Sequence, residues 1–168
     1  PWQQLEPTAG SYAISSEMDW PLSQLASFGM TPIICIGSGN TNYGTVAGHI
    51  DNQTAITAYA TAAQKLAEFA FSKNIYNLVI EVLNEPGENS GFIDYANYVQ
   101  LVKATYDAVK SVNPSYSVIA YASTSTGSYY FNRKCFEMGI ADFCDAFALH
   151  IYSSTAPEID RKRIEKFK

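Results

Sequence analysis

The sequence has few of the residues that bind metals, nucleotides or nucleic acids. It contains two histidines and three cysteines, with no HxxxH, HxH or CxxC spacing, so we expect no metal site. No GxGxxG motif follows a predicted strand, which argues against a dinucleotide, and we expect no cofactor. The net charge is -5 and the one basic run is residues 161–163, which argues against a nucleic-acid partner.

Long apolar runs are also missing from the chain. None approaches the ~20 residues of a membrane span, so we expect no membrane partner. The composition is 47% hydrophobic and 16% charged over 168 residues, which is typical of one globular domain with a substantial core. The cysteines fit either buried thiols or a disulfide between Cys135 and Cys144.

Helical and strand-like segments alternate along the chain after an opening loop at residues 2–12. Four short apolar runs are predicted strands: 32–36, 79–83, 117–122 and 145–151. Five segments with helical spacing are predicted helices: 17–28, 53–72, 95–112, 131–138 and 159–168. This alternation predicts an α/β fold with parallel strands and right-handed crossovers, and it fits both an open doubly wound sheet and a closed barrel.

The second predicted strand ends in a polar sequence, Asn84-Glu85-Pro86. Pro86 cannot continue a strand ladder, so Asn84 and Glu85 are expected at the carboxyl end of a buried strand. Ligands bind at that end in α/β proteins, and a carboxyl group there is a candidate proton donor. Period-two alternation places Glu81 on the same face as Glu85 but deeper, and we expect Glu81 to be a buried structural acid.

The other predicted strands also end in polar side chains. Asn40 and Tyr43 follow the first strand, and His150 and Tyr152 lie at the end of the fourth. In a parallel barrel these ends converge on one face. An amide, an imidazole and phenols around a carboxyl group suit a hydroxyl-rich substrate, because each can exchange hydrogen bonds with ring hydroxyls.

Several of these segments together resemble a known enzyme family. Residues 81–86, Glu-Val-Leu-Asn-Glu-Pro, resemble the fourth-strand motif of the retaining glycosidases built on (β/α)8 barrels. The other similar segments are Trp-x-x-x-Glu-Pro-x-x-Gly-x-Tyr at 2–12, Gly-Asn-x-x-Tyr at 39–43, Leu-His-Ile-Tyr at 149–152 and Ala-Pro-Glu at 156–158. In order and spacing the chain is most similar to glycoside hydrolase family 39 and its polysaccharide-degrading relatives.

The resemblance implies roles for individual residues. Glu85 would be the general acid/base, and Asn84 would bind the sugar 2-hydroxyl. The side chains that would line the sugar site are Asn40, Tyr43, His150 and Tyr152. Glu81 would pair with an arginine on a strand that this sequence lacks. The substrate would be an oligo- or polysaccharide, and we expect a secreted or extracytoplasmic protein although no signal peptide is visible.

The resemblance also places the four predicted strands as the third to sixth of a TIM-type barrel. Residues 1–168 are then expected to be a partial (β/α)8 catalytic domain without the first two and last two strands, because a whole barrel takes ~250 residues. Retaining glycosidases need a second carboxylate as nucleophile, on the seventh strand in this clan. We therefore expect the chain alone to be inactive.

Two alternative interpretations remain open. The first is a non-catalytic, carbohydrate-binding half-barrel that self-associates through its exposed sheet edges. The second is an unrelated α/β enzyme in which Asn84-Glu85 is a coincidence.

Overall fold

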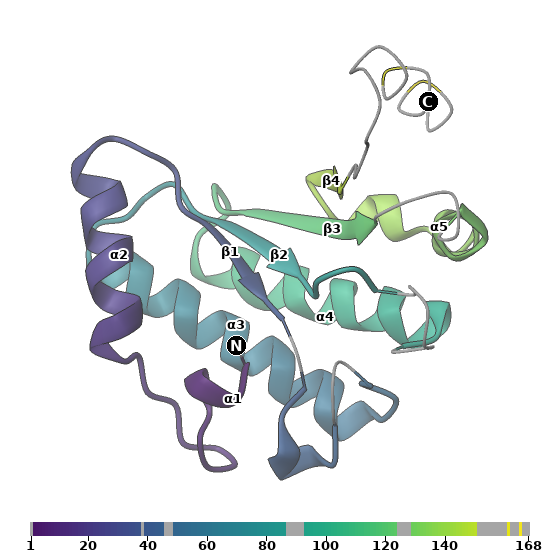
Figure 1. Ribbon diagram of the computed structural model, residues 1–168, viewed down its shortest axis with the longest axis horizontal. Coiled ribbons are helices and arrows are strands. Elements are labelled where there is room, and N and C mark those ends of the chain that lie inside the picture. The colour runs from purple at the N-terminus through teal and green to yellow at the C-terminus, as the bar shows by residue number, and fades with distance from the viewer. Residues whose placement is uncertain are drawn as a thin grey trace.

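The computed structural model describes residues 2–37, 39–45, 49–86, 93–123, 129–150, 161 and 165. At its centre is a parallel sheet with the strand order β1-β2-β3-β4. The strands are β1 (Ile33–Ile36), β2 (Val79–Val82), β3 (Ser117–Ser123) and β4 (Ala146–Leu149). Each consecutive pair of strands is joined through a helix (Figure 1). The predicted α/β class, the parallel pairing and the four strands are confirmed.

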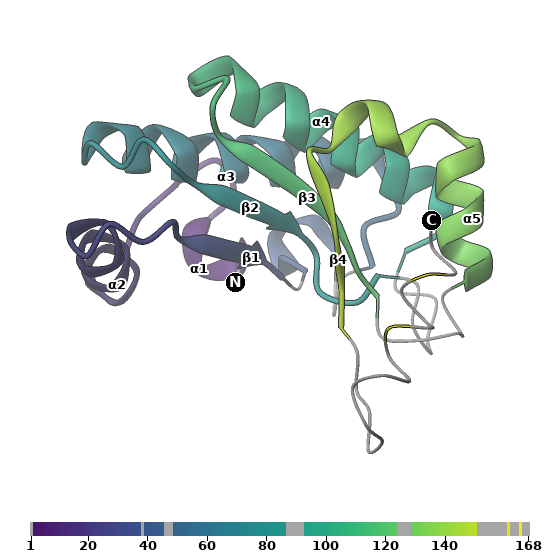
Figure 2. The same ribbon diagram turned by 90° about the horizontal axis from the view of Figure 1, so that it is seen from above.

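The structure describes five helices around this sheet. They are α1 (Trp2–Leu5), α2 (Ser16–Ser27), α3 (Gln53–Ser72), α4 (Tyr95–Val112) and α5 (Tyr129–Glu137), with 3-10 turns η1 (Thr41–Tyr43) and η3 (Ile140–Phe143). Figure 2 shows α3 and α4 side by side on the same side of the strands. Ile80 and Val118 point toward these helices and are fully buried, whereas Ile33 on the opposite face is 64% exposed. The described residues therefore leave the second face of the sheet largely uncovered.

The two long helices begin at side-chain caps. The Asn52 side chain accepts a hydrogen bond from the Ala55 amide at 2.8 Å, which fixes the start of α3. Asp94 accepts from the Ala96 and Asn97 amides and so caps the start of α4. Such caps satisfy amide groups that have no partner within the helix, typically worth ~1 kcal/mol.

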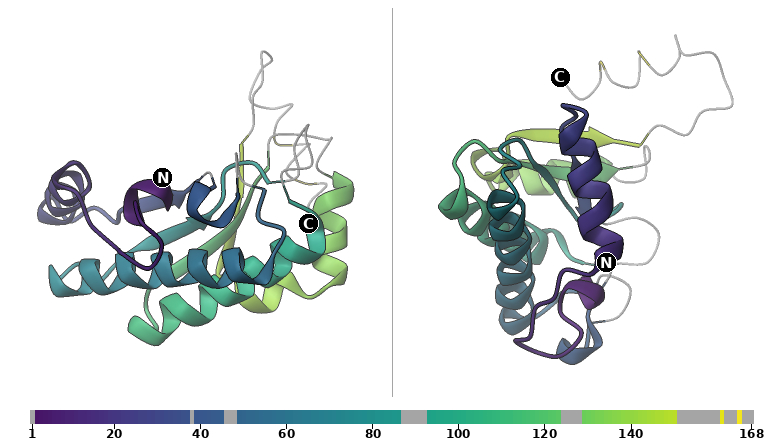
Figure 3. Two further views of the ribbon diagram at one scale, coloured as in Figure 1. Left: turned by 90° about the horizontal axis from the view of Figure 1, so that it is seen from below. Right: turned by 90° about the vertical axis from the view of Figure 1, so that its left-hand side faces the viewer.

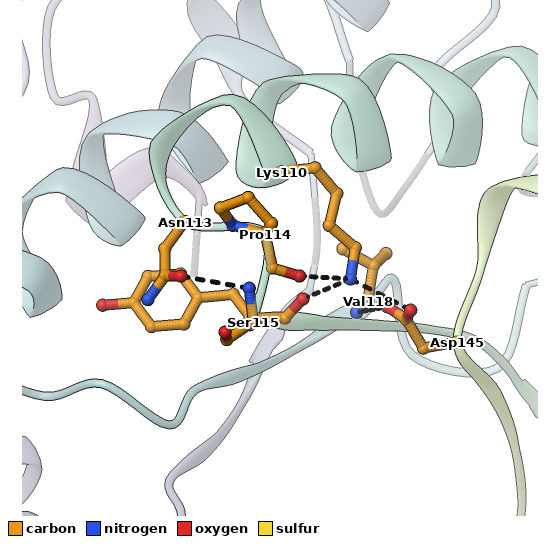
Figure 4. A network of polar contacts seen from close by, with 7 residues as sticks. Lys110, Asn113, Pro114, Ser115, Val118 and Asp145 are labelled. Atoms are coloured by element: carbon orange, nitrogen blue, oxygen red, sulfur yellow. Dashed lines mark hydrogen bonds and ion pairs between the residues drawn. The ribbon is translucent and has the colours of Figure 1, made fainter.

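An ion pair holds the start of β4 against β3 (Figure 4). The Lys110 ammonium at the end of α4 donates to the Tyr116 carbonyl at 2.6 Å and contacts Asp145 at 3.0 Å. The other carboxylate oxygen of Asp145 accepts from the Val118 amide at 2.8 Å. The Lys110 and Asp145 side chains thus tie the end of α4 to the starts of β3 and β4.

Three local predictions need correction or fall outside the described residues. Residues 2–5 form the short helix α1, not a loop, because the Trp2 and Leu5 side chains are buried in the core. Cys135 and Cys144 are free thiols, so the disulfide alternative is wrong, and Cys35 is exposed rather than buried. The predicted helix 159–168 lies almost wholly outside the described residues.

Candidate active site

The chain turns sharply out of the sheet directly after β2. Leu83 has φ 60° and Glu85 has φ 51°, both in the left-handed region that non-glycine residues rarely adopt. The strand therefore ends at Val82, and the predicted extension of regular alternation through Leu83 to Glu85 is wrong. Backbone in this region persists only where the surrounding structure holds it, and such residues cluster at functional sites.

Two buried tyrosines hold the backbone at this turn. The Tyr98 hydroxyl of α4 donates to the Val82 carbonyl at 3.1 Å. The Tyr59 hydroxyl of α3 accepts from the Leu83 amide at 3.1 Å and donates to the Ile36 carbonyl at the end of β1. Because the turn takes Leu83 away from strand geometry, these hydroxyls supply hydrogen bonds that the sheet ladder does not. We call the pair of Tyr59 and Tyr98 the tyrosine clamp.

His150 lies between the two glutamates of the β2 segment. Its Nδ1 atom is 3.0 Å from the Glu85 carboxylate, and its Nε2 atom is 3.9 Å from the Glu81 carboxylate. The side chains are 29% exposed for His150, 25% for Glu85 and 11% for Glu81, so solvent reaches Glu85 more readily. His150 follows β4, and its imidazole contacts Glu85, which follows β2, two strands away in the sheet. The structure thus brings together Glu85 and His150, which the sequence placed at strand ends, and Glu81, which it placed deeper in the strand.

The deeper carboxylate, Glu81, lies between His150 and Cys35. Counted over backbone and side chain together, Glu81 is 8% exposed, and its carboxylate faces His150 on one side. On the other side lies Cys35, its neighbour across the β1–β2 ladder. Although the residue is exposed, neighbouring atoms desolvate its thiol, and this desolvation, then the charge of Glu81 and a hydrogen bond to it, raises the pKa of the Cys35 thiol to about 12. The thiol therefore stays protonated at neutral pH beside Glu81.

The remaining candidates divide between two places. Asn84 is exposed beside Glu85, where a ligand can reach it. Tyr152 lies outside the described residues. Asn40 is fully buried: its amide nitrogen donates to the Glu6 carbonyl at 3.0 Å and its amide oxygen accepts from the Asn42 amide at 3.0 Å. Its side chain thus holds the loop after β1 against the segment after α1.

Tyr43 belongs to a second polar cluster around Glu6. The Glu6 carboxylate is fully buried and accepts hydrogen bonds from Trp2 Nε1 at 2.8 Å, from the Gly10 amide at 2.8 Å and from the Tyr43 hydroxyl. The Trp2 and Tyr43 rings stack at 5.3 Å. Glu6 belongs to the Trp-x-x-x-Glu-Pro segment, from which no role for it is predicted. The four-residue spacing to Trp2 was the available signal, because it fits one helical turn.

Within the described part of the chain, no group of three or more histidine, cysteine and acidic side chains is placed to hold a metal ion. No described helix combines the length and apolarity that a bilayer crossing requires. The arrangement at the end of β2 is therefore a pair of carboxylates flanking an imidazole, with one carboxylate open to solvent. Such a group can exchange a proton with a bound ligand.

Comparisons with known proteins agree with this fold. No protein-family model matches the sequence, and no curated protein is significantly similar to it. Among solved structures, the chain is similar to a family 39 glycoside hydrolase from the gut symbiont Bacteroides cellulosilyticus WH2, with a TM-score of 0.73 and 25% sequence identity. The match covers 89% of this chain and 31% of that protein. The chain thus has a glycosidase-like fold and spans about a third of that enzyme's length.

Proposed function

We propose that this chain is the part of a retaining glycoside hydrolase that carries the general acid/base, Glu85. The observation that supports the proposal most strongly is the contact of 3.0 Å between His150 and Glu85 at the carboxyl end of a parallel sheet with a glycosidase-like fold. In parallel barrels the reacting groups lie at this end of the strands. The carboxylate is partly exposed, so a substrate can reach it, and an imidazole restricts its orientation.

In the proposed reaction Glu85 acts twice. It first donates a proton to the glycosidic oxygen as the bond to the leaving group breaks. It then takes a proton from the water that releases the sugar from the enzyme. His150 positions the Glu85 carboxyl group, and Glu81 holds His150 from the opposite side at 3.9 Å. The tyrosine clamp keeps the turn that carries Glu85 in its left-handed conformation.

The substrate contacts follow from the same geometry. Asn84, exposed beside Glu85, is proposed to bind the sugar 2-hydroxyl, and Tyr152 to line the site from the segment after His150. Asn40 contributes by shaping the loop after β1, because its amide is already hydrogen-bonded within that loop. The proposed substrate is an oligo- or polysaccharide, and the proposed location is outside the cytoplasm.

The nucleophile is proposed to lie outside residues 1–168. A retaining enzyme needs two carboxyl groups about 5–5.5 Å apart on either side of the scissile bond. Glu81 is a poor second carboxylate because it is 8% exposed and faces His150 and Cys35 rather than solvent. The 168-residue chain alone should therefore hydrolyse neither aryl glycosides nor polysaccharides. Turnover by this chain that is lost in Glu85→Gln would contradict that placement.

A second candidate is a carbohydrate-binding half-barrel without catalysis. The uncovered face of the sheet, where Ile33 is 64% exposed, favours it. Activity of the complete protein separates the two candidates, because a binding module turns over no glycoside.

Leaving-group dependence tests the role of Glu85 in the complete protein. Glu85→Gln keeps the side-chain size but cannot donate the proton. We expect a loss of about 10²–10⁴-fold in the glycosylation step for substrates with poor leaving groups, and a smaller loss for activated aryl glycosides. Glu68→Gln, an exposed carboxylate on α3, is the control and should leave both rates unchanged. Equal losses on both substrate types would contradict the proposal.

A further inference from the structure

A pocket lies apart from the Glu85 site, where the segment after α1 and the loop after β1 meet the start of α3. Figure 3 shows α1 and the loop containing η1 close to α3. The pocket has a volume of about 400 Å³, within the range typical of small-molecule sites. Its walls are formed by Tyr12, Tyr43, Gln53, Thr54, Thr57 and Ala58.

The aromatic wall of this pocket is held rigidly. Tyr43 stacks on Trp2 with an interplanar angle of 10°, and Trp2 packs edge-on against Tyr59. The Tyr43 hydroxyl donates to the buried Glu6 carboxylate, so its oxygen keeps a lone pair to accept a hydrogen bond from a ligand. A ligand would meet rings that are already in place, which lowers the entropy cost of binding.

The pocket is lined by neutral side chains. Burial, followed by the charge of Glu6 and a hydrogen bond to it, raises the pKa of Tyr12 to about 12. Burial and Glu6 also raise the pKa of Tyr43. Both phenols therefore stay protonated at physiological pH. No lysine, arginine or histidine is among the six lining residues, and the carboxylate behind the rings disfavours an anion.

Polar groups face the aromatic wall from the first turns of α3. Gln53, Thr54 and Thr57 are exposed there. The Gln53 amide and the Thr54 hydroxyl can donate and accept, whereas the Thr57 hydroxyl donates to the Gln53 carbonyl at 2.9 Å and so offers a ligand an acceptor. Their mutual contact, from Gln53 Nε2 to Thr57 Oγ1, is long at 3.4 Å and so is readily exchanged for a ligand. Aromatic rings on one side and hydroxyl and amide groups on the other match the apolar faces and hydroxyl edges of a sugar ring.

We propose that this pocket is a carbohydrate-binding subsite for one or two neutral sugar units, separate from Glu85. The choice of a sugar as ligand rests in part on the proposed function. Of the residues that line the pocket, only Tyr43 was also a candidate for the sugar site in that function. On a polysaccharide chain, such a subsite would hold one part of the substrate while another part occupies the catalytic site.

Ligand-observed NMR on the 168-residue chain tests the subsite directly. The probes are xylose, glucose, xylobiose and cellobiose, with choline and inorganic phosphate as cationic and anionic comparisons. We expect at least one neutral sugar to bind with a dissociation constant on the order of millimolar, as the usual free energy per ligand atom predicts. Binding should be constant between about pH 5 and pH 9, because the phenols do not ionise there.

Substitutions locate the bound sugar. Thr54→Arg fills the pocket from an exposed position, so the fold should tolerate it, and it should weaken binding about tenfold or more. Gln100→Arg, on the exposed face of α4, is the matched control and should bind normally. Glu85→Gln instead reports on sugar bound at the catalytic site, because the pocket does not include Glu85.

The outcomes separate the two proposals. Binding that Glu85→Gln abolishes and Thr54→Arg leaves intact would overturn the subsite and leave the proposed function standing. No binding of any neutral sugar, or a preference for choline or phosphate, would also overturn the subsite. Normal binding together with a catalytically silent Glu85 in the complete protein would overturn the proposed function alone.

Discussion

Replacing Tyr59 by phenylalanine should destabilise the chain far more than the loss of one surface hydroxyl would. The hydroxyl is fully buried and serves two backbone groups, the Ile36 carbonyl and the Leu83 amide. Leaving a buried polar group without a partner costs about 1–3 kcal/mol, so we expect a loss of about 2–4 kcal/mol in the free energy of unfolding. For a chain of this size that corresponds to a fall in Tm of about 4–16 °C.

Thermal and denaturant unfolding followed by far-UV circular dichroism measure this effect. Tyr76→Phe is the matched control, because its residue is 56% exposed and its hydroxyl donates to Asn74 in a solvent-accessible contact. The control should change the free energy of unfolding by less than about 0.5 kcal/mol. If Tyr59→Phe costs no more than Tyr76→Phe, the tyrosine clamp does not hold the turn after β2.

The same residue predicts a dependence of stability on alkaline pH. Burial raises the pKa of Tyr59 well above its ordinary value of 10, so the folded chain holds this proton more tightly than the unfolded chain. The contribution to stability is therefore complete below pH 10 and is lost as the pH rises above it. Stability should fall less steeply above pH 10 in Tyr59→Phe than in the unchanged chain, and equal slopes would contradict this assignment.

Two further predictions concern the loop after β1 and the start of β4. A Cβ at Gly39 would lie 2.5 Å from the Thr45 carbonyl oxygen, so Gly39→Ala should destabilise the chain by about 1–3 kcal/mol. The control is Gly37→Ala, whose Cβ would have its nearest contact at 3.8 Å and which should cost less than about 1 kcal/mol. Asp145→Ala should cost about 1–3 kcal/mol because it removes an ion pair and a backbone contact, and the exposed Asp107→Ala should cost under about 0.5 kcal/mol. Urea unfolding measures the free energy of unfolding of both pairs of variants. An equal loss for a variant and its control would refute the explanation given for that position.

Local sequence signals were sufficient for most of the secondary structure. The bounds of α3 and α4 follow from the sequence because their caps, periodicity and stop residues are all local. The turn after β2 does not, because its left-handed residues are held by side chains from α3 and α4 that contact it only in the folded chain. The apolar run that predicts the strand continues through Leu83, where the structure leaves the sheet.

Only part of the candidate site could be predicted from the sequence. Parallel strand ends converge, so Glu85 and His150 could be placed on one rim from the sequence. The partners of Glu81 could not, because Cys35 approaches it from the neighbouring strand β1 and His150 from the end of β4, two strands away. The role of Asn40 in its loop depends on the Glu6 carbonyl, 34 residues away, and no local pattern reports such a contact.

Chemical rescue of Glu85→Ala in the complete protein tests the central claim most directly. Without the general base, the glycosyl-enzyme intermediate should accumulate on an activated aryl glycoside, because water is no longer deprotonated. Azide needs no general base, so adding it should accelerate turnover and yield a glycosyl azide of retained anomeric configuration. Two results would contradict the assignment of Glu85 as the acid/base. One is turnover by Glu85→Ala at the rate of the unchanged protein. The other is a slow variant whose turnover azide does not accelerate and which forms no glycosyl azide.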